Sequence, residues 1–533
     1  MPSRQVVTAG RRTAIVLLGL LLLGIALRVV AIGREPLWAD ESLTAILVRY
    51  PWWSFPFTSV DATPPLFYWL EKALVPEGAP PAAWRLVSLV AGVVTIPLTY
   101  WFGRELKSRT AGLIAAGLVT VSAPLVDYSQ EARAYALAVA MIAGSAAALA
   151  ALTGGRLTGD AQRTARRRML AAFGAFTVLA AFSHFIAIFW VLPALLLLRL
   201  AADGNRSAIE PREMLATILA MLPFLAIELR REYVFRSEQN SFAWLAQLSP
   251  PQILRILAEQ WLPFARVGGW PVALAALGFI LALVWLVRAP LAAWCRAHSL
   301  QAAIVGALLL EPAALWLFGE LAAPVAMPRT FLPATIGFAA FAGVLIASLP
   351  RPASYWLGAA AVALSLASTL MSDTVRHKEQ WAGAAAVTRS APVVVSCPNW
   401  KTPSFLAQAK DVGWVITSYG NHALVVRQPG ETATWDRLYF ERVQRYGHYP
   451  MRRERQMRLE PRPITADRLL FVASECSEIE RKAFADWAHL RASRTLWRSP
   501  QTDDAATISV EEWQLGGDAP LDLWIVRSGQ RRF

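Results

Sequence analysis

Long apolar runs most constrain what this chain of 533 residues can fold into. A run of about 20 residues is the length at which a helix crosses the ~30 Å hydrocarbon core of a bilayer. Only 17% of the residues are charged, against about 25% in soluble domains. The sequence therefore predicts eleven membrane helices, near residues 13–32, 84–102, 111–126, 134–153, 169–183, 186–200, 213–228, 270–288, 301–318, 331–349 and 353–372.

The chain changes character near Ser372. Beyond this point charged residues are frequent, and the apolar runs shorten to the length of strands. These shorter runs are Val393–Val395, Trp414–Ile416, Leu469–Val472 and Leu523–Val526. Because such runs alternate with amphipathic stretches such as Glu478–Leu490, they predict an α/β domain with a partly parallel sheet. We expect a polytopic α-helical membrane domain over 1–372 and an accessory α/β domain over 373–533.

Basic residues in the short connections predict the orientation in the membrane. Arg and Lys concentrate in cytoplasmic loops, and here they follow every second predicted helix, as at Arg104, Lys107 and Arg109. The net charge of +14 thus indicates membrane topology and not nucleic-acid binding. We expect a multi-pass protein of the bacterial inner membrane. Its N-terminus is cytoplasmic on an uncleaved anchor, and its C-terminal domain is periplasmic.

The first outer loop, residues 33–83, is unusually aromatic and also carries carboxylates. Its segments 41–50 and 65–74 are predicted to form short helices in the membrane interface, anchored by residues such as Trp52 and Trp69. Asp40, Glu41 and Asp61 would then lie close to the membrane surface. A carboxylate there can take a proton from a hydroxyl, whereas the structural alternative is that Asp40 caps a helix beginning at Glu41.

Four motifs carry a resemblance to a known family. They are Trp38-Ala39-Asp40-Glu41 followed by Asp61-Ala62-Thr63-Pro64-Pro65-Leu66, then Tyr128–Leu137 (YSQEARAYAL), Pro328–Pro333 (PRTFLP) and His377–Ala382 (HKEQWA). Together they resemble GT-C glycosyltransferases related to the protein O-mannosyltransferases of family 39 and to the lipid A aminoarabinose transferases. Two positions depart from that pattern: Thr63 stands where many relatives have His, and Phe331 where Tyr is usual.

The resemblance implies an inverting transfer of a sugar from a polyprenyl-phosphate donor to an acceptor outside the cytoplasm. Asp40 would be the general base, with Glu41 and Asp61 orienting hydroxyls. Arg133 and Arg329 would bind the donor phosphate, although an arginine such as Arg133 can also simply extend to the interface. Substrate contacts are expected from Tyr68, Gln130, Glu131, Tyr135 and His184, and the structural alternative for His184 is a hydrogen-bonded packing residue.

No cofactor is expected from the spacing of metal-binding residue types. The first outer loop has no D-x-D triplet, and the six histidines show no H-E-x-x-H spacing. Some relatives use a divalent cation and others none, so the resemblance leaves this open. The expected partners are the polyprenyl-phosphate sugar, membrane lipids and a lipid, glycan or protein acceptor; neither the sugar nor the acceptor can be identified from the residues.

A transporter or flippase for a lipid-linked saccharide is the rival class. Transporters place binding groups at the bilayer midplane and often have repeated halves, whereas here the polar candidates gather at one face and no repeat is evident. Two cysteines, Cys397 and Cys476, each follow a strand-like run. In an oxidising periplasm they could form a disulfide; otherwise they are two buried thiols.

Overall fold

The computed structural model describes residues 4–30, 32–35, 37–48, 52, 63–76, 79–154, 157, 162–203, 211–239, 247–322, 324–373, 381–398, 401–409, 411–419, 422–430, 457–499, 507–516 and 520–528. The chain divides into two compact units. Unit 1 comprises Met1–Ile32, Asp61–Leu74 and Arg85–Val375, and unit 2 comprises Gly33–Val60, Val75–Trp84 and Arg376–Phe533. Parts of the first outer loop therefore belong to the same unit as the C-terminal domain.

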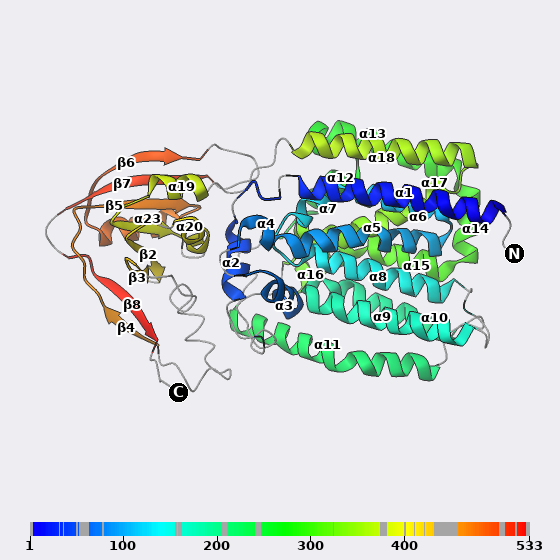
Figure 1. Ribbon diagram of the computed structural model, residues 1–533, viewed down its shortest axis with the longest axis horizontal. Coiled ribbons are helices and arrows are strands. Elements are labelled where there is room, and N and C mark those ends of the chain that lie inside the picture. Colours follow the sequence, from blue (N-terminus) through cyan, green and yellow to red (C-terminus); the bar gives the residue numbers. More distant parts are fainter. Residues whose placement is uncertain are drawn as a thin grey trace. The chain divides into compact units, whose positions relative to one another are not determined.

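Unit 1 is a bundle of long helices that lie side by side (Figure 1). Its helices are α1 (Arg4–Val29), α3 (Pro65–Leu74), α5 (Leu86–Leu106), α6 (Arg109–Thr120), α7 (Ala123–Ser129), α8 (Tyr135–Thr153), α9 (Arg163–Ser183), α10 (Ile188–Asp203), α11 (Pro211–Gln239), α12 (Pro250–Trp261), α13 (Ala265–Leu286), α14 (Arg288–Ala297), α15 (Ser299–Leu309), α16 (Glu311–Leu321), α17 (Leu332–Ile346) and α18 (Arg351–Asp373). Two short 3-10 helices, η3 (Phe185–Ala187) and η4 (Pro328–Phe331), complete it.

Each predicted apolar run falls on a helix or a bent helix pair, but the number of clear spans is smaller than expected. Among the described residues, 6 helices are long and apolar enough to cross a membrane, or up to 8 if the bent pairs α6–α7 and α15–α16 are counted as single spans. The apolar helix over Phe185–Ala201 is shorter than a span, and α9 opens with the charged sequence RTARRR. The predicted total of eleven is therefore not confirmed.

Helix α8 lies in the interior of unit 1. Of its most apolar window, 89% is buried, against 11% for α1. Its alanine-rich sequence lets neighbouring helices approach closely, as small residues do in membrane bundles. Polar side chains also join the helices: the indole N–H of Trp190 donates to Ser145 Oγ at 3.0 Å, and Ser145 Oγ lies 2.8 Å from Thr177 Oγ1.

Glycines bring α5 and α6 into backbone contact. A Cβ atom on Gly112 would lie 2.5 Å from the carbonyl oxygen of Tyr100, and one on Gly103 would lie 2.9 Å from the Cα atom of Gly112. No side chain fits at either position without movement of the backbone. The close approach of α5 and α6 therefore depends on these two residues.

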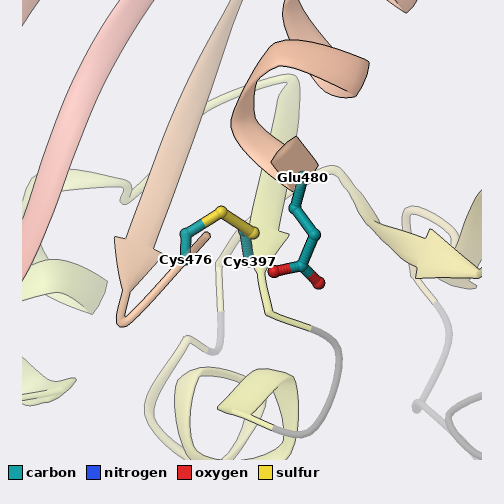
Figure 2. Close-up of side chains that lie close together, drawn as sticks. All are labelled: Cys397, Cys476 and Glu480. Atoms are coloured by element: carbon teal, nitrogen blue, oxygen red, sulfur yellow. A yellow bond between two sulfur atoms is a disulfide. The ribbon is translucent and has the colours of Figure 1, made fainter. Parts of the chain in front are cut away.

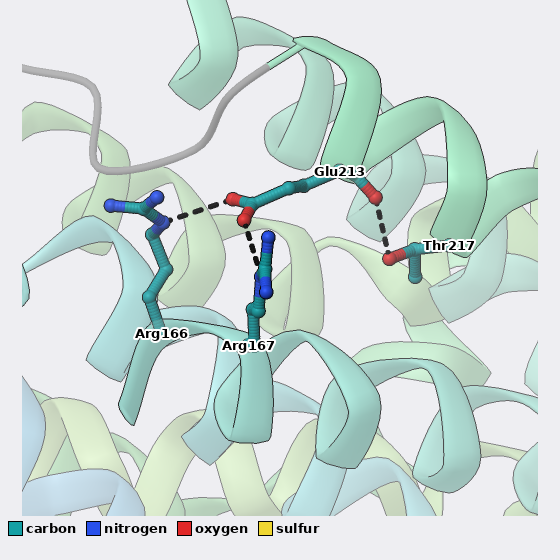
Figure 3. Close-up of polar contacts among 4 residues, drawn as sticks. All are labelled: Arg166, Arg167, Glu213 and Thr217. Atoms are coloured by element: carbon teal, nitrogen blue, oxygen red, sulfur yellow. Dashed lines mark hydrogen bonds and ion pairs between the residues drawn. The ribbon is translucent and has the colours of Figure 1, made fainter. Parts of the chain in front are cut away.

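An ion-pair group links the first turns of α9 and α11 (Figure 3). The carboxylate of Glu213 accepts hydrogen bonds from Arg166 Nε at 3.0 Å and from Arg167 Nε at 2.9 Å. The side chain of Arg166 is 7% exposed, and that of Arg167 is 60% exposed. Because burial makes a charge more costly to leave uncompensated, the ion pair with Glu213 matters more for Arg166 than for Arg167.

The C-terminal part of unit 2 is the α/β domain that the sequence predicts. Eight strands form one sheet in the order β4-β8-β3-β2-β1-β5-β7-β6. They are β1 (Val393–Cys397), β2 (Trp414–Tyr419), β3 (His422–Arg427), β4 (Met457–Pro461), β5 (Arg468–Ser474), β6 (Leu490–Arg498), β7 (Ile508–Leu515) and β8 (Leu523–Ser528). β1 pairs in parallel with both β2 and β5, and β3 pairs in parallel with β8. The sheet is thus partly parallel, as expected.

Helices cover both faces of the sheet around β1. Val394 packs in one cluster with Trp381 of α19 (Trp381–Val387) and Phe405 of α20 (Thr402–Gln408). Its neighbours Val393 and Val395 pack in another cluster, which includes residues of α23 (Glu478–Trp487). Since successive side chains of a strand face opposite sides, the three consecutive valines of β1, Val393–Val395, require burial on both faces.

Cys397 and Cys476 form a disulfide (Figure 2). Their Cα atoms are 5.4 Å apart. Cys397 is the last residue of β1, and Cys476 follows the end of β5 by two residues. The disulfide therefore joins the carboxyl ends of two adjacent parallel strands.

Candidate active site

The segment between α7 and α8 places Arg133 in the interior of unit 1. The backbone leaves α7 at Ser129 and enters α8 at Tyr135. Ser88 Oγ of α5 donates to the carbonyl oxygen of Arg133 at 2.9 Å, which fixes this turn against the bundle. Arg133 is 6% exposed, far less than an arginine that reaches out to the interface. The interface interpretation of this residue is therefore wrong.

Thr63 accepts a hydrogen bond from this arginine. Nη2 of Arg133 donates to Thr63 Oγ1 at 3.2 Å. Thr63 is buried and is followed by Pro64 and by α3, which begins at Pro65. One of the two positions that depart from the family pattern is thus occupied by a side chain that forms a hydrogen bond with Arg133.

Two further predicted site residues, Arg329 and His184, lie near a third, Tyr135, which is the first residue of α8. Cζ of Arg329, in η4, lies 5.7 Å from the centroid of the Tyr135 ring. The centroid of the His184 ring lies 4.7 Å from that of Tyr135. These residues come from three separate segments of unit 1, and Arg133 is two positions before Tyr135. We refer to Thr63, Arg133, Tyr135, His184 and Arg329 as the Arg133 cluster.

His184 is oriented by its own backbone turn. Its Nδ1 accepts a hydrogen bond from the N–H of Ile186 at 3.3 Å, and the residue is 3% exposed. Because Nδ1 acts as an acceptor, a neutral imidazole carries its proton on Nε2. This hydrogen bond fits the interpretation of His184 as a packing residue, and a substrate contact through its Nε2 atom stays a prediction.

The other predicted contact residues have defined places near the cluster. Nε2 of Gln130 donates to the carbonyl oxygens of Leu27 and Val30 at 3.0 and 2.9 Å, so this side chain ties the α7–α8 turn to the end of α1. Glu131 is 7% exposed. Tyr68 is buried on α3 and makes an edge contact with Phe67.

Asp40 and Glu41 lie in unit 2, in the first turn of α2 (Ala39–Leu47). The helix begins at Ala39, so the alternative that Asp40 caps a helix beginning at Glu41 is wrong. Oε2 of Glu41 instead accepts a hydrogen bond from the N–H of Trp38 at 3.2 Å, and Glu41 is fully buried. Asp40 is half-buried. Asp61 lies outside the described residues, as do residues 377–380 of the fourth motif.

One group of candidate metal ligands is present among the described residues. It consists of Cys397, Cys476 and Glu480 (Figure 2). The two sulfur atoms are joined in the disulfide, and a thiolate is the form that binds metals. The carboxylate of Glu480 accepts hydrogen bonds from Ser477 in the capping box of α23. This group is therefore a disulfide beside a helix cap and not a metal centre.

Comparisons place this arrangement among known folds. No protein-family model and no curated protein matches the chain. A crystal structure of ArnT from Cupriavidus metallidurans in the apo state aligns with a TM-score of 0.54 and 13% sequence identity, covering 94% of this chain and 98% of that chain. The same protein bound to undecaprenyl phosphate gives 0.53 and 13%, covering 92% and 97%. An oligosaccharyltransferase of Archaeoglobus fulgidus gives 0.49 and 12%, covering 74% and 64%.

The chain has the GT-C fold. The resemblance that the four sequence motifs indicate is thereby confirmed at the level of the fold. Because the ArnT alignment covers nearly all of both chains, the GT-C likeness includes the C-terminal part as well as the helical bundle.

Two charged residues of the α/β domain, Lys401 and Glu475, lie outside the four sequence motifs and are not among the predicted site residues. Lys401 is 4% exposed, and its Nζ lies 3.2 Å from Oε2 of Glu475. Helix α20, which follows Lys401, packs against α2. Neither residue has a sequence signal of its own, because the segments that bring them together are far apart along the chain.

Proposed function

We propose that this protein is a membrane glycosyltransferase that moves a sugar from a polyprenyl-phosphate donor to an acceptor hydroxyl on the outer face of the inner membrane. The observation that carries the proposal is the Arg133 cluster of a GT-C fold: the guanidinium group of Arg329 lies 5.7 Å from the Tyr135 ring, and the buried Arg133, two positions before Tyr135, is held by Thr63. The ArnT structure with undecaprenyl phosphate supports a lipid phosphate as the ligand class.

In this proposal Arg133 and Arg329 bind the donor phosphate. A guanidinium group presents paired N–H donors that match two phosphate oxygens. As the bond between the anomeric carbon and the phosphate oxygen breaks, negative charge grows on the phosphate. Fixed cations in a site with little water stabilise that charge and contribute about 10²- to 10³-fold in rate per donor group. Thr63 holds Arg133 in position for this role.

Asp40 takes the proton of the acceptor hydroxyl, and the acceptor oxygen then forms its bond to the anomeric carbon. The bond to phosphate breaks in the same displacement, which predicts inversion at that carbon. General-base catalysis of this kind contributes about 10²- to 10⁴-fold in rate. Glu41 is assigned to holding the start of α2, because its carboxylate is buried on the Trp38 amide. Asp61, Glu131, Tyr68 and His184 are assigned to hydroxyl contacts.

The transporter alternative receives less support. A flippase would require a polar path through the bundle, yet α8 at the interior of unit 1 is lined almost entirely by small apolar residues. The Arg133 cluster lies instead where α8 and α17 begin and where α9 ends. The disulfide in the α/β domain also fits an oxidising compartment, which supports the expected periplasmic location of that domain.

Binding of undecaprenyl phosphate to the purified full chain tests the phosphate site. We expect Arg133→Ala and Arg329→Ala each to weaken binding at least tenfold, since a charge-assisted hydrogen bond contributes about 1.5–3 kcal/mol. Arg296→Ala, at an exposed arginine of α14, is the matched control. Unchanged affinity in both cluster variants contradicts the proposal.

Mass spectrometry of envelope lipids, glycans and proteins tests the reaction and identifies the acceptor. Cells with the wild-type gene should contain a glycosylated species that is missing from cells with the Asp40→Asn variant. Asp486→Asn, at an exposed position of α23, is the control for loss of a carboxylate. If the Asp40→Asn cells retain every glycosylated species, Asp40 is not the base.

A further inference from the structure

Lys401 carries a charge into the interior of unit 2. It immediately precedes α20, which follows the carboxyl end of β1, and only 4% of it is exposed. Burial of an ammonium group is costly unless anions compensate it. Burial accordingly lowers the pKa of Lys401, and the nearby carboxylates of Glu475 and Asp40 oppose that shift. Lys401 is therefore held where two carboxylates act on it.

The disulfide fixes the first of these two partners. Oε2 of Glu475 lies 3.2 Å from the ammonium nitrogen. Glu475 directly precedes Cys476, and Lys401 follows Cys397 by four residues, so the disulfide joins the two segments that carry the pair. The side chain of Glu475 is 54% exposed. An ion pair with so much exposure to water contributes little stability by itself.

The second partner comes from the first outer loop. Helix α2, which carries Asp40 in its first turn, packs against α20. Glu41, the neighbouring carboxylate, is turned to the amide of Trp38. Asp40 is thus the carboxylate of α2 that acts on Lys401. The loop that the sequence assigns to the membrane domain is attached, at this point, to the α/β domain.

We propose that Lys401 is a positioning residue for Asp40, and that the α/β domain therefore belongs to the catalytic apparatus. This inference rests on the proposed function, in which Asp40 removes the acceptor proton. The ammonium group limits the rotamers of the carboxylate, so that it presents the same oxygen in each turnover. Loss of such orientation costs up to about 10²-fold in rate even when the reacting groups remain.

The test is Lys401→Met, a substitution that retains the length of the side chain and removes the charge. We expect kcat for sugar transfer to fall about 10- to 10²-fold, with KM for the donor changed by less than about threefold, because orientation and not binding is lost. Lys401→Arg should restore most of kcat. Lys482→Met, at an exposed lysine of α23, is the matched control.

Glu475→Gln separates positioning from simple structural support. The amide oxygen of the new side chain can still accept a hydrogen bond from the ammonium group, and the pair is half-exposed, so kcat should fall by about threefold or less. Equal losses of kcat in Lys401→Met and Glu475→Gln would overturn the proposal, because loss of the ion pair between Lys401 and Glu475 would then explain both results. Hydrogen exchange across 393–397 and 468–474 shows whether each variant retains the folded sheet.

The Asp40→Asn background distinguishes failure of this inference from failure of the proposed function. If Asp40→Asn is inactive and Lys401→Met matches the wild type, Lys401 has no positioning role while the base assignment stands. If Asp40→Asn transfers sugar normally, both are overturned. In the residual activity of Asp40→Asn, adding Lys401→Met should have no further effect, since coupled residues are not additive.

Discussion

Nη2 of Arg133 donates a 3.2 Å hydrogen bond to Oγ1 of Thr63, which lies 70 positions earlier in the chain. Both residues are buried, so the bond is shielded from water. It connects the first-loop motif to the motif at the start of α8. The Asp61–Leu66 motif has Thr63 where the family pattern has His. Through this threonine the motif is joined to the candidate phosphate site.

Thr63→Val removes this hydroxyl and keeps the shape of the side chain. We expect affinity for undecaprenyl phosphate to fall about 3- to 10-fold, because a buried hydrogen bond contributes about 0.5–1.5 kcal/mol. Equilibrium binding to the purified protein measures the effect. Thr495→Val, at an exposed position of β6, should bind as the wild type does; equal affinity in both variants would show that Thr63 does not support Arg133.

Replacement of both Cys397 and Cys476 by Ser should loosen the carboxyl ends of β1 and β5. The disulfide spans 79 residues of sequence, and loss of a native disulfide costs about 2–5 kcal/mol. Faster hydrogen exchange at 393–397 and 468–474 in the full chain is the expected result. Cys295→Ser, at the cysteine outside the disulfide, should leave exchange unchanged. Exchange that is as slow in the double variant would contradict the expectation.

Gly112→Ala should destabilise the bundle by about 1–3 kcal/mol, since overpacking a tight contact forces the backbone to move. The added methyl group would lie 2.5 Å from the Tyr100 carbonyl oxygen. Thermal unfolding of the detergent-solubilised protein measures the loss. Gly278→Ala is the control, because nothing lies within 4 Å of a Cβ at that position; equal midpoints for both variants would be inconsistent with the close contact of α5 and α6.

Glu213→Gln should also lower the thermal midpoint. It removes the negative charge of the ion pair with Arg166, whose side chain is 7% exposed, and loss of a hydrogen bond to a buried charged group costs about 1–3 kcal/mol. The control is Glu259→Gln, because Glu259 pairs with an Arg255 side chain that is 70% exposed. A midpoint that falls no further for Glu213→Gln than for this control would contradict the prediction.

Local patterns in the sequence predict much of the architecture. The two loop helices expected at 41–50 and 65–74 occur as α2 (Ala39–Leu47) and α3 (Pro65–Leu74), because both have amphipathic spacing and α3 opens with a proline, which is favoured at the first helical position. The strand-length apolar runs occur as β1, β2, β5 and β8. Periodicity is a local property, so it identifies such elements without reference to the rest of the chain.

Pairings between distant segments are what the sequence does not determine. Nothing around Thr63 indicates Arg133 as its partner, and nothing around Lys401 indicates Glu475 or the helix that carries Asp40. The N-cap alternative for Asp40 is wrong because α2 begins at Ala39, which places Asp40 inside the first turn. The number of spans differs partly because bends divide α6 from α7 and α15 from α16, and partly because the apolar helix over Phe185–Ala201 is shorter than a span and α9 opens with charged residues.

The burial of α8 limits which amino-acid substitutions this protein can accept. With 89% of its apolar window enclosed, almost any larger side chain on α8 must displace a neighbouring helix. α1, with 11% enclosed, accepts most apolar replacements at no such cost. A saturation library should therefore tolerate apolar substitutions at the exposed positions of α1 and reject larger side chains along α8, and improved variants are best sought at the periphery of the bundle.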